Sequence, residues 1–593
     1  EIAQCLVGSE MCIRDRYLKK YRKNVILGPI FKLTEAVFEL IVPLVMAKII
    51  DIGIAHKDSG YIWKMGGVLV LLGVCGLGFA LICQYVASVA SQGFGTELRR
   101  ELYHHINTLS HKEVDEFGTP SLITRLTSDI NQLQVAVAML IRLVVRAPFL
   151  VIGSTIMAFM IDVKLALIFV LVIPLVAIVM WLVTTRTIPF FKSIQKKLDK
   201  TSLITRENLV GARAVRAFSK QQHEIERFRD NAEDIEKAAV RAGKISALLS
   251  PVNAIILNLA IVAIIWFGGF SVNVGDLTQG QVIALVNYMN QILLALVVVA
   301  NLVVIFTKSA ACAARVNEVL DTKPSVTETE STEENGDSSA PAVKFDKVYF
   351  SYHDNSEYAL EDISFTAEKG QTIGIIGGTG SGKSTLINLI PRFYDASGGL
   401  VEVYGTDVRN YSLNRLRNKI AVVPQKAVLF SGTIRENMKW GGDNITDEQI
   451  WRALKISQAY EFVEKLENGL DYKILQGGKN LSGGQKQRLT IARAIAADPE
   501  ILILDDSASA LDFATDAKLR TAIKENCSDM TVFIISQRAN TVKNADQIIV
   551  LDDGKTVGIG THKELLQSCT DYCQICLTQF SAEELEKEIN GDE

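Results

Sequence analysis

The sequence has little net charge and few cysteines for its length. Its 62 basic and 66 acidic residues leave a formal net charge of −4 over 593 residues, so a whole-chain attraction to nucleic acid is not indicated. The nine cysteines are scattered, which argues against a disulfide framework. Cys569, Cys573 and Cys576 would share one face of a helix. A packed helix face accounts for that spacing better than a metal cluster does.

The first sixteen residues lack the order of basic, apolar and small residues that marks a signal peptide. They resemble translated sequencing-adapter text. We therefore expect residues 1–16 to be a non-native leader and the protein itself to begin near Tyr17.

Long stretches of the first half lack charged residues altogether. A helix that crosses a lipid bilayer needs about 20 predominantly apolar residues. Four runs contain no Asp, Glu, Lys or Arg: 66–91, 165–183, 245–275 and 277–307. Two weaker runs are 25–50, which carries Glu35, Glu39 and Lys48, and 135–161, which carries Arg142 and Arg146. The sequence thus predicts a membrane domain of six helices over residues 17–320.

Basic residues predict the orientation of these spans. They are dense in residues 186–244 and at the entry to the first span, whereas the opposite connections are nearly free of them, with Lys57 and Lys164 the main exceptions. Cytoplasmic loops carry the excess of Lys and Arg. Both termini and the two long loops that follow the second and fourth spans are therefore expected in the cytoplasm.

The composition changes after the last span. Residues 321–342 are rich in Thr, Ser, Glu and Pro, which is typical of a flexible acidic linker. Residues 343–580 then alternate short β-branched runs with helical patterns, which predicts an α/β nucleotide-binding domain. The runs predicted as strands are 343–350, 371–376, 419–423, 501–505, 531–536 and 547–551. Residues 581–593 form a charged tail.

A phosphate-binding motif follows the second of these strands. The Walker A loop needs glycines because its backbone must wrap the phosphates closely, and the helix after it adds a favourable dipole. Lys383 would pair with the β- and γ-phosphates, and Ser384 would ligate Mg²⁺. The residues of the predicted loop are Gly377, Gly378, Thr379, Gly380, Ser381, Gly382, Lys383, Ser384 and Thr385.

The motifs together resemble those of the ATP-binding cassette family, preceded by an exporter-type membrane domain. The resemblance implies ATP and Mg²⁺ as cofactors. It implies that Tyr352 stacks on adenine, that Gln425 senses Mg²⁺ and that Asp505 ends Walker B on the metal side. The D-loop would be residues 509–512. The signature sequence, which completes the ATP site of a second cassette, matches Ser482, Gly483, Gly484 and Gln485 before a helix predicted over 486–496.

Two positions depart from the family pattern. Asp506 stands where the family has a glutamate that polarises the attacking water, and Gln537 stands at the switch histidine. The aspartate is one methylene shorter, and misplacement on the ångström scale can reduce the rate by ~10²-fold. Glutamine can hydrogen-bond a γ-phosphate but carries no positive charge. These changes predict a site that holds ATP and rarely cleaves it.

Two cytoplasmic segments match the family's coupling regions. The first covers residues 113–129, with the matching stretch 111–118 at its start and Phe117 within it. The second covers residues 207–218, includes Gly211 and Phe218, and would reach the cassette of a partner chain. Polar residues within the spans are candidates for lining a transport cavity or for bonding helices together. The principal candidates are Glu35, Glu39, Asn287, Asn290 and Gln291; Gln84, Asn253, Asn258 and Asn301 are further ones.

The sequence therefore predicts the degenerate subunit of a heterodimeric exporter in the bacterial inner membrane. Such a protein would drive amphipathic compounds (drugs, lipids or peptides) outward with a second half-transporter as partner. A homodimer with two slow sites, an uptake transporter of the siderophore type and a non-transporting ATP-dependent regulatory subunit are the alternatives. The identities of the substrate and of the partner do not follow from the sequence.

Overall fold

The computed structural model describes residues 18–328, 340–352, 357–442, 444–581 and 585. The predicted leader lies outside the described residues, as do residues 329–339 of the predicted linker and most of the predicted tail. The chain divides into two compact units. The first contains the residues up to Asn107 together with Pro120–Thr322, and the second contains Thr108–Thr119 together with Lys323–Glu593.

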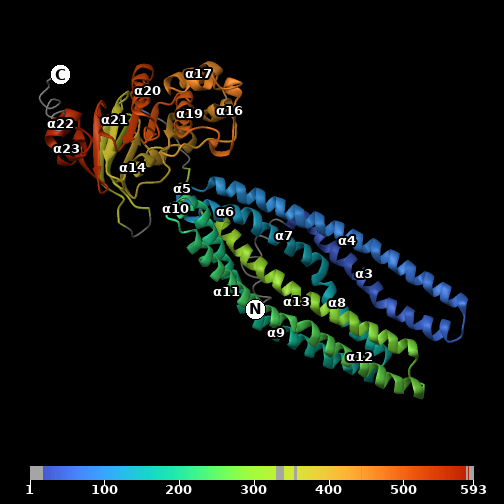
Figure 1. Cartoon of the computed structure of the whole chain (residues 1–593). Coiled ribbons are helices and arrows are strands. Elements are labelled where there is room, and N and C mark those ends of the chain that lie inside the picture. Colours follow the sequence, from blue (N-terminus) through green and yellow to red (C-terminus); the bar gives the residue numbers. More distant parts are fainter. Residues whose placement is uncertain (1–17, 329–339, 353–356, 443, 582–584, 586–593) are drawn as a thin grey trace. The chain divides into compact units, whose positions relative to one another are not determined.

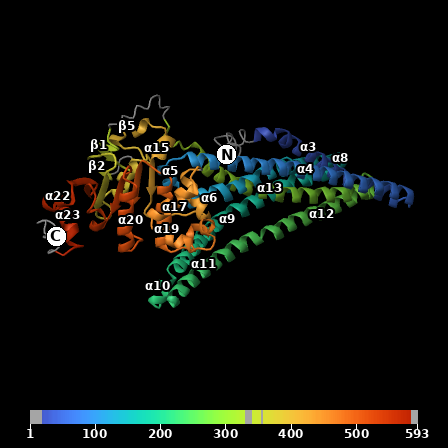
Figure 2. The ribbon, with the colours of Figure 1, turned by 90° about the horizontal axis from the view of Figure 1, so that it is seen from above.

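The first unit is built of long helices that run side by side in both views (Figure 1, Figure 2). They are α3 (Arg22–Lys48), α4 (Ser59–Thr108), α8 (Arg146–Ile161), α9 (Val163–Val210), α11 (Gln221–Ala247), α12 (Leu249–Val274) and α13 (Gln279–Asp321). The shorter helices α6 (Thr119–Thr124) and α7 (Ile130–Met139) lead into α8, and α10 (Ala212–Ala217) joins α9 to α11.

Five helical stretches of the described residues are long and apolar enough to cross a membrane: Ser59–Thr108, Thr119–Ile161, Val163–Val210, Gln221–Val274 and Gln279–Asp321. They contain five of the six predicted spans. The sixth forms α3, whose middle carries Lys32, Glu35 and Glu39. The Lys32 ammonium lies 2.6 Å from the Glu35 carboxylate, and both side chains are largely buried. This pairing reduces the cost of placing two charges among apolar helices.

The helix boundaries follow from local capping. The Asp162 side chain accepts a hydrogen bond from the Leu165 amide at 2.7 Å and so starts α9. Thr278 and Gln281 form a reciprocal capping box that starts α13. Both caps separate runs that the sequence predicts as distinct spans.

Small residues allow the helices of the first unit to pack closely. Ala36, Ala158 and Ala166 are fully buried in its main apolar cluster. The buried Tyr288 side chain fills space between α13 and α3, and its hydroxyl donates to the Leu40 carbonyl at 2.6 Å. A polar group in apolar surroundings is thereby satisfied.

The second unit contains two main sheets. The larger has the strand order β12-β11-β3-β10-β9-β6, with parallel pairing except between β11 and β12. Its strands are β3 (Thr372–Gly377), β6 (Ile420–Val423), β9 (Ile501–Asp505), β10 (Thr531–Ser536), β11 (Gln547–Asp552) and β12 (Lys555–Gly560). The antiparallel sheet, in the order β2-β1-β4-β5, has β1 (Val343–Phe350), β2 (Leu360–Ala367), β4 (Gly398–Val403) and β5 (Thr406–Asp407). The strands β7 (Gly432–Thr433) and β8 (Lys473–Ile474) form a separate pair.

Both faces of the larger sheet are covered. The strand β9 is buried on both sides: Ile501 and Ile503 pack into one apolar cluster, and Leu502 and Leu504 into another. The helices of this unit are α5 (His111–Phe117), α14 (Lys383–Leu389), α15 (Leu413–Lys419), α16 (Ile434–Met438), α17 (Asp447–Ile456), α18 (Tyr460–Glu464), α19 (Gly483–Ala496), α20 (Phe513–Asn526), α21 (Ala539–Val542), α22 (His562–Ser568) and α23 (Thr570–Leu577).

The predicted fold class, a helical membrane domain followed by an α/β domain, is confirmed. The strands β1, β9 and β10 begin and end where the sequence predicts them, and β3, β6 and β11 differ by at most one residue at either end. The carboxyl ends of the parallel strands lie at one edge of the sheet, where ligands bind in open α/β folds.

Candidate functional site

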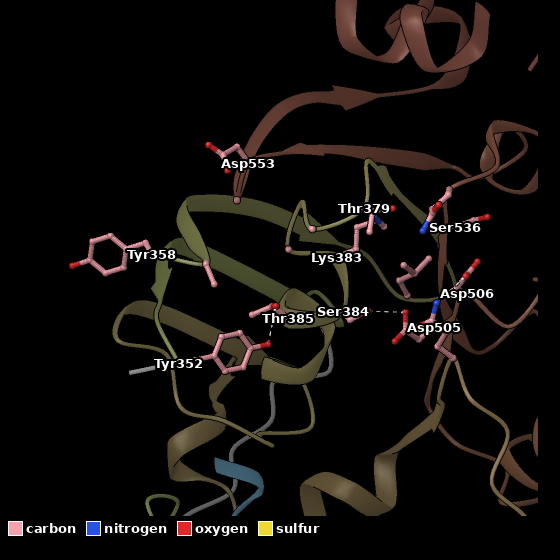
Figure 3. A pocket seen from close by; sticks show the side chains of 17 residues that line it. Tyr352, Tyr358, Thr379, Lys383, Ser384, Thr385, Asp505, Asp506, Ser536 and Asp553 are labelled. Carbon is pink, nitrogen blue, oxygen red and sulfur yellow. Dashed lines mark hydrogen bonds between the residues drawn. The ribbon is translucent and has the colours of Figure 1, made fainter. Parts of the chain in front are cut away.

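A cleft of about 360 Å³ lies at this edge (Figure 3). Its lining comes from the carboxyl ends of β3, β6, β9, β10 and β11, with the loops that follow them, and from the segment between β1 and β2. The lining residues are Tyr352, Tyr358, Ala359, Thr379, Gly380, Gly382, Lys383, Ser384, Thr385, Gln425, Asp505, Asp506, Ile535, Ser536, Gln537, Asp553 and Gly554. Tyr358, Asp553 and Gly554 have no motif signal in the sequence, and only the fold brings them to the cleft.

The loop after β3 has the backbone that its glycines predict. Gly380 and Gly382 have φ angles of +86° and +92°, which L side chains adopt only with strain. Gly382 immediately precedes α14, whose first residue is Lys383. The Lys383 ammonium donates to the carbonyl oxygens of Gly377, at 3.0 Å, and Gly378, and lies 3.3 Å from the Ser381 hydroxyl. Burial lowers the pKa of Lys383, and the nearby Asp506 and Asp505 carboxylates oppose that shift.

A hydroxyl and a carboxylate meet beside this loop. The Ser384 hydroxyl donates to Asp505 Oδ1 at 3.1 Å (Figure 3). Burial raises the pKa of Asp505, and the bond from Ser384 opposes the shift. Oxygen ligands of these two kinds suit Mg²⁺, which binds proteins through one or two carboxylates and keeps several waters. The donor set therefore fits the predicted metal.

The third predicted metal residue has a different partner. Gln425 lines the cleft, but its side-chain amide donates to Asp506 Oδ2 at 3.2 Å. Asp506 follows β9 directly and has a φ angle of +42°, a left-handed conformation that aspartate tolerates better than most residues. Its amide donates to the Ile535 carbonyl at 3.0 Å. The Asp506 carboxylate is thus engaged by the Gln425 side chain in this structure.

The loop at Gln537 is held by a residue that the sequence analysis did not identify. Gln579, just after α23, donates from Nε2 to the Gln537 carbonyl at 2.9 Å. Its Oε1 accepts from the Ala539 amide at 2.8 Å. The two bonds bracket Arg538. No sequence motif links positions 42 residues apart, so this contact could come only from the structure.

Tyr352 lies at the opposite end of the cleft. Its side chain is 39% exposed, which leaves a ring face available to a ligand. Its hydroxyl lies 2.9 Å from the Thr385 hydroxyl, and its ring packs edge-on against Phe350 and Tyr394 at centroid distances of 4.9 and 5.5 Å. The tyrosine predicted to stack on adenine therefore lies on the cleft, anchored to the first turn of α14.

The signature residues lie apart from this cleft: its lining, within the described part of the chain, includes none of residues 482–485. Ser482 and Gln485 form a reciprocal capping box at the start of α19. A methyl group added at Gly483 would meet nothing within 4 Å. The D-loop residue Asp512 caps α20 by accepting from the Thr515 amide at 2.9 Å.

The two predicted coupling segments are found mainly in different units. The start of the first forms α5, which ends at Phe117 and belongs to the second unit, whereas its part from Pro120 on belongs to the first unit. The second forms α10 in the first unit, between Gly211 and Phe218. Phe218 is 75% exposed, and Leu209 and Val210 just before α10 are 73% and 83% exposed.

Two of the cavity candidates lie together. Glu39 and Gln291 line a cavity of about 320 Å³ in the first unit with Arg146, which pairs with Glu39 at 2.6 Å. The Gln291 amide donates to the Glu39 carbonyl at 3.2 Å. The other principal candidates do not line it. Glu35 pairs with Lys32, and the amides of Asn287 and Asn290 donate to carbonyls of their own helix.

The three C-terminal cysteines lie against the apolar core of the second unit. Cys569 and Cys576 are buried there, and Cys573 is partly exposed. Among the residues that the structure describes, no three His, Cys, Asp or Glu side chains are placed to hold a metal ion.

Comparison with known proteins matches both halves of the chain. The model described as ABC transporter transmembrane region matches residues 25–297, and the model described as ABC transporter matches residues 360–509. An uncharacterized ABC transporter ATP-binding protein of Mycobacterium tuberculosis is 37% identical over 96% of this chain and 98% of its own length. An ATP-dependent lipid A-core flippase of Desulfotalea psychrophila is 36% identical over 83% of this chain and 85% of its own length.

A solved structure shares the fold. A bacterial Atm1-family ABC exporter with ATP bound has a TM-score of 0.79 to this chain at 23% identity, covering 94% of this chain and 99% of that one. At this identity the likeness concerns the fold alone.

Proposed function

Because the chain belongs to the ABC transporter family, with a membrane region followed by an ATP-binding cassette, we propose that it is the degenerate half of a heterodimeric exporter. In this proposal the chain binds ATP in its own cleft and hydrolyses it rarely. Its signature completes a competent site on the partner chain. The assembly moves amphipathic compounds outward across the bacterial cytoplasmic membrane.

The observation that carries the proposal is the contrast between a complete binding set and an altered catalytic pair in one cleft. Lys383, Ser384 and Asp505 have the types and positions that phosphate and Mg²⁺ require. Asp506 has a short side chain bonded to Gln425, and Gln537 replaces an imidazole by a neutral amide. A shorter base that is also hydrogen-bonded elsewhere orients the attacking water poorly.

The predicted ATP-binding residues of the cleft then have the following roles. Tyr352 stacks on the adenine, and Lys383 donates to the β- and γ-phosphates, which also lie at the N-terminus of α14. Ser384, Asp505 and Gln425 would hold Mg²⁺, which neutralises phosphate charge when bound. Gln537 donates a hydrogen bond toward the γ-phosphate and distinguishes ATP from ADP.

Exposed apolar surfaces support a partner chain. On the first unit, Leu209, Val210 and Phe218 surround α10 with little cover. On the second unit, Phe430 and Trp440 stack at a centroid distance of 3.8 Å while remaining 40% and 61% exposed. Exposed clusters of large apolar residues are typical of protein–protein contact sites. A second half-transporter would cover both.

An amphipathic substrate is supported by the cavity at Glu39, Arg146 and Gln291. It combines apolar walls with a charge pair carried by predicted membrane spans, and such groups mark substrate pathways. The Desulfotalea psychrophila relative is named a lipid A-core flippase, which favours a lipid-like compound here. Uptake in the opposite direction, a homodimer with two slow sites and a purely regulatory subunit remain the alternatives.

The first test uses the purified full-length chain alone. We expect it to bind ATP with Mg²⁺ but to turn over far below the ~10 s⁻¹ typical of enzymes. Robust hydrolysis by the chain alone would refute the degenerate site.

The second test uses the chain with its partner, sought as a neighbouring reading frame with Glu and His at the two catalytic positions. Lys383→Ala should leave much of the heterodimer's ATPase activity intact, whereas Ser482→Ala should nearly abolish it. The opposite ranking would mean that the competent and degenerate sites are assigned the wrong way round. Transport of a labelled amphipathic dye into vesicles that contain both chains separates an exporter from a regulatory subunit.

A further inference from the structure

The short helix α5 packs with the second unit although the chain runs to it directly from α4. The Ser110 hydroxyl accepts from the Val326 amide at 3.0 Å, and Glu113 Oε1 accepts from the Ser325 amide at 3.2 Å. The same two side chains form the capping box of α5. The start of α5 is therefore fixed to the segment that enters the cassette.

Two aromatic residues of the cassette also contact α5. The Tyr394 hydroxyl donates to Asp115 Oδ2 of α5 at 3.0 Å. The His111 ring lies 4.5 Å from the Phe393 ring, whose other contacts include the Arg417 guanidinium at 5.5 Å. Tyr394 thus provides the hydrogen bond from the cassette body to the middle of α5.

The position of this aromatic pair is tied to the phosphate loop. The helix α14 starts at Lys383 and ends at Leu389, and the turn that follows presents Phe393 and Tyr394. Arg392 holds the turn: it has a φ angle of +52°, is 3% exposed and binds Asp395 through two nitrogen atoms at 2.7 and 3.1 Å. A bidentate ion pair of this kind restrains geometry strongly.

Tyr394 also contacts the end of the cleft where Tyr352 would stack on the adenine base. The rings of Phe350, Tyr352 and Tyr394 form a cluster in which every pair lies within 4.9 to 5.6 Å. Tyr352 is the member that also lines the cleft. A ring that stacks on a base loses freedom, and its edge-on neighbour must adjust to it because packed aromatic side chains have few alternative rotamers.

We propose that Tyr394 is a positioning residue that reports adenine on Tyr352 to α5 through its hydrogen bond to Asp115. The proposal rests on the proposed function, since it requires ATP in this cleft. It gives the degenerate site a role that needs no hydrolysis: base occupancy alone stiffens the contact with α5. Filling the phosphate loop without a base does not produce the effect.

Hydrogen exchange of the full-length protein with its membrane region tests this. ATP with Mg²⁺ should slow exchange at residues 377–384 and, by about fivefold, at the α5 amides of residues 111–117. Inorganic tripolyphosphate fills the phosphate loop without a base, so it should protect 377–384 and leave 111–117 unchanged. Equal protection of α5 by both ligands would overturn the relay.

The matched variants separate the hydroxyl from the ring. Tyr394→Phe keeps the contacts with Phe350 and Tyr352 and should abolish most of the α5 response, with the ATP Kd unchanged within about twofold. Asp115→Asn keeps an acceptor oxygen and should retain the response, whereas Asp115→Ala should lose it. Tyr411→Phe, which removes a hydroxyl bond to the Val403 carbonyl in the same unit, is the control and should respond as wild type does.

The outcomes distinguish the two claims. If ATP fails to protect 377–384, the proposed ATP site is wrong. If ATP protects 377–384 but leaves 111–117 unchanged, or if Tyr394→Phe responds fully, the ATP site stands and the relay is wrong.

Discussion

The phosphate side and the catalytic side of the cleft differ in how their polar groups are engaged. On the phosphate side, Lys383 reaches three oxygen atoms of its own loop and Ser384 meets Asp505, so the groups that receive ATP already converge. On the catalytic side, Asp506 is bonded to Gln425, and the backbone carbonyl of Gln537 accepts a hydrogen bond from Gln579. The two sides of the cleft therefore depend on different contacts, so a change on one side need not disturb the other.

The largest expected effect concerns how closely the backbone packs around the glycines of the phosphate loop. A methyl group at Gly377 would lie 2.1 Å from the Leu551 carbonyl oxygen, whereas one at Gly378 would meet nothing within 4 Å. Gly377→Ala should lower the free energy of unfolding of the cassette by ~3 kcal/mol or prevent folding, because backbone must move. Gly378→Ala should change it by less than ~0.5 kcal/mol. Thermal unfolding of the full-length protein in detergent measures both, and equal shifts would contradict this packing.

The next effect concerns restoring the catalytic side. Asp506→Glu with Gln537→His should raise hydrolysis at this site by ~10–100-fold, or about 1.4–2.7 kcal/mol of barrier. The gain stays partial because a glutamate tolerates the φ angle of +42° at position 506 less well than an aspartate does. Alteration of the partner's signature would limit it further.

Turnover at this single site is measured in a heterodimer whose partner site is silenced. No gain would place the defect outside the catalytic pair. Turnover at the rate of the partner's own site would mean that neither the backbone at 506 nor the opposing signature limits the reaction.

A third prediction uses the ionisation of Asp505. Burial raises its folded-state pKa above the ordinary value of 3.8, so the stabilising contribution of the protonated form is lost as pH rises through the folded pKa. In the absence of nucleotide, Asp505→Asn should match wild type below that ordinary value and exceed its Tm increasingly above it. When Mg²⁺ and ATP are present at neutral pH, wild type should instead have the higher Tm, because the metal prefers the carboxylate of Asp505 to the amide of the variant.

The measurement is Tm against pH with and without Mg-ATP. The Asp516→Asn variant serves as a control: burial also raises the pKa of Asp516, but this residue does not line the cleft. Its ranking against wild type should not reverse with Mg-ATP. A reversal there would mean that the ligand effect is not specific to Asp505.

Much of the fold follows from the sequence where burial is uniform. The strand β9 reads as an unbroken apolar run because both of its faces are covered, and its limits are as predicted. The strand β12 was missed because it is exposed at alternate positions and contains two glycines, Gly558 and Gly560, that weaken the pattern. Six spans were predicted, and five of them lie in helical stretches of the described residues that are long and apolar enough to cross a membrane. The helix α3, with its internal charge pair, is not among these stretches.

The site shows a similar division. Its motif residues could be placed because loop chemistry is local in sequence, and the structure brings Tyr352, Lys383, Asp505 and Gln537 into one cleft. Contacts between distant segments could not be predicted from one sequence. The hydrogen bond between Tyr394 and Asp115 of α5 is the clearest of these, since the two residues are 279 positions apart in the sequence.

The smallest expected effect tests the hydrogen bonds of Gln579 to the loop at Gln537. Gln579 is itself exposed, so each of its two hydrogen bonds contributes about 0.5–1 kcal/mol. Gln579→Ala should free the loop at Gln537 and reduce the preference for ATP over ADP by about threefold, since the Gln537 amide would meet the γ-phosphate less often. Gln579→Glu keeps the acceptor for the Ala539 amide but sets a carboxylate against the Gln537 carbonyl, so it should be at least as damaging.

Gln574→Ala, on the exposed face of α23, is the control. Competition binding of ATP and ADP to the full-length chain measures the preference. If Gln579→Ala matched the control, the loop would keep its position without these hydrogen bonds, and the catalytic side would be as firmly built as the phosphate side.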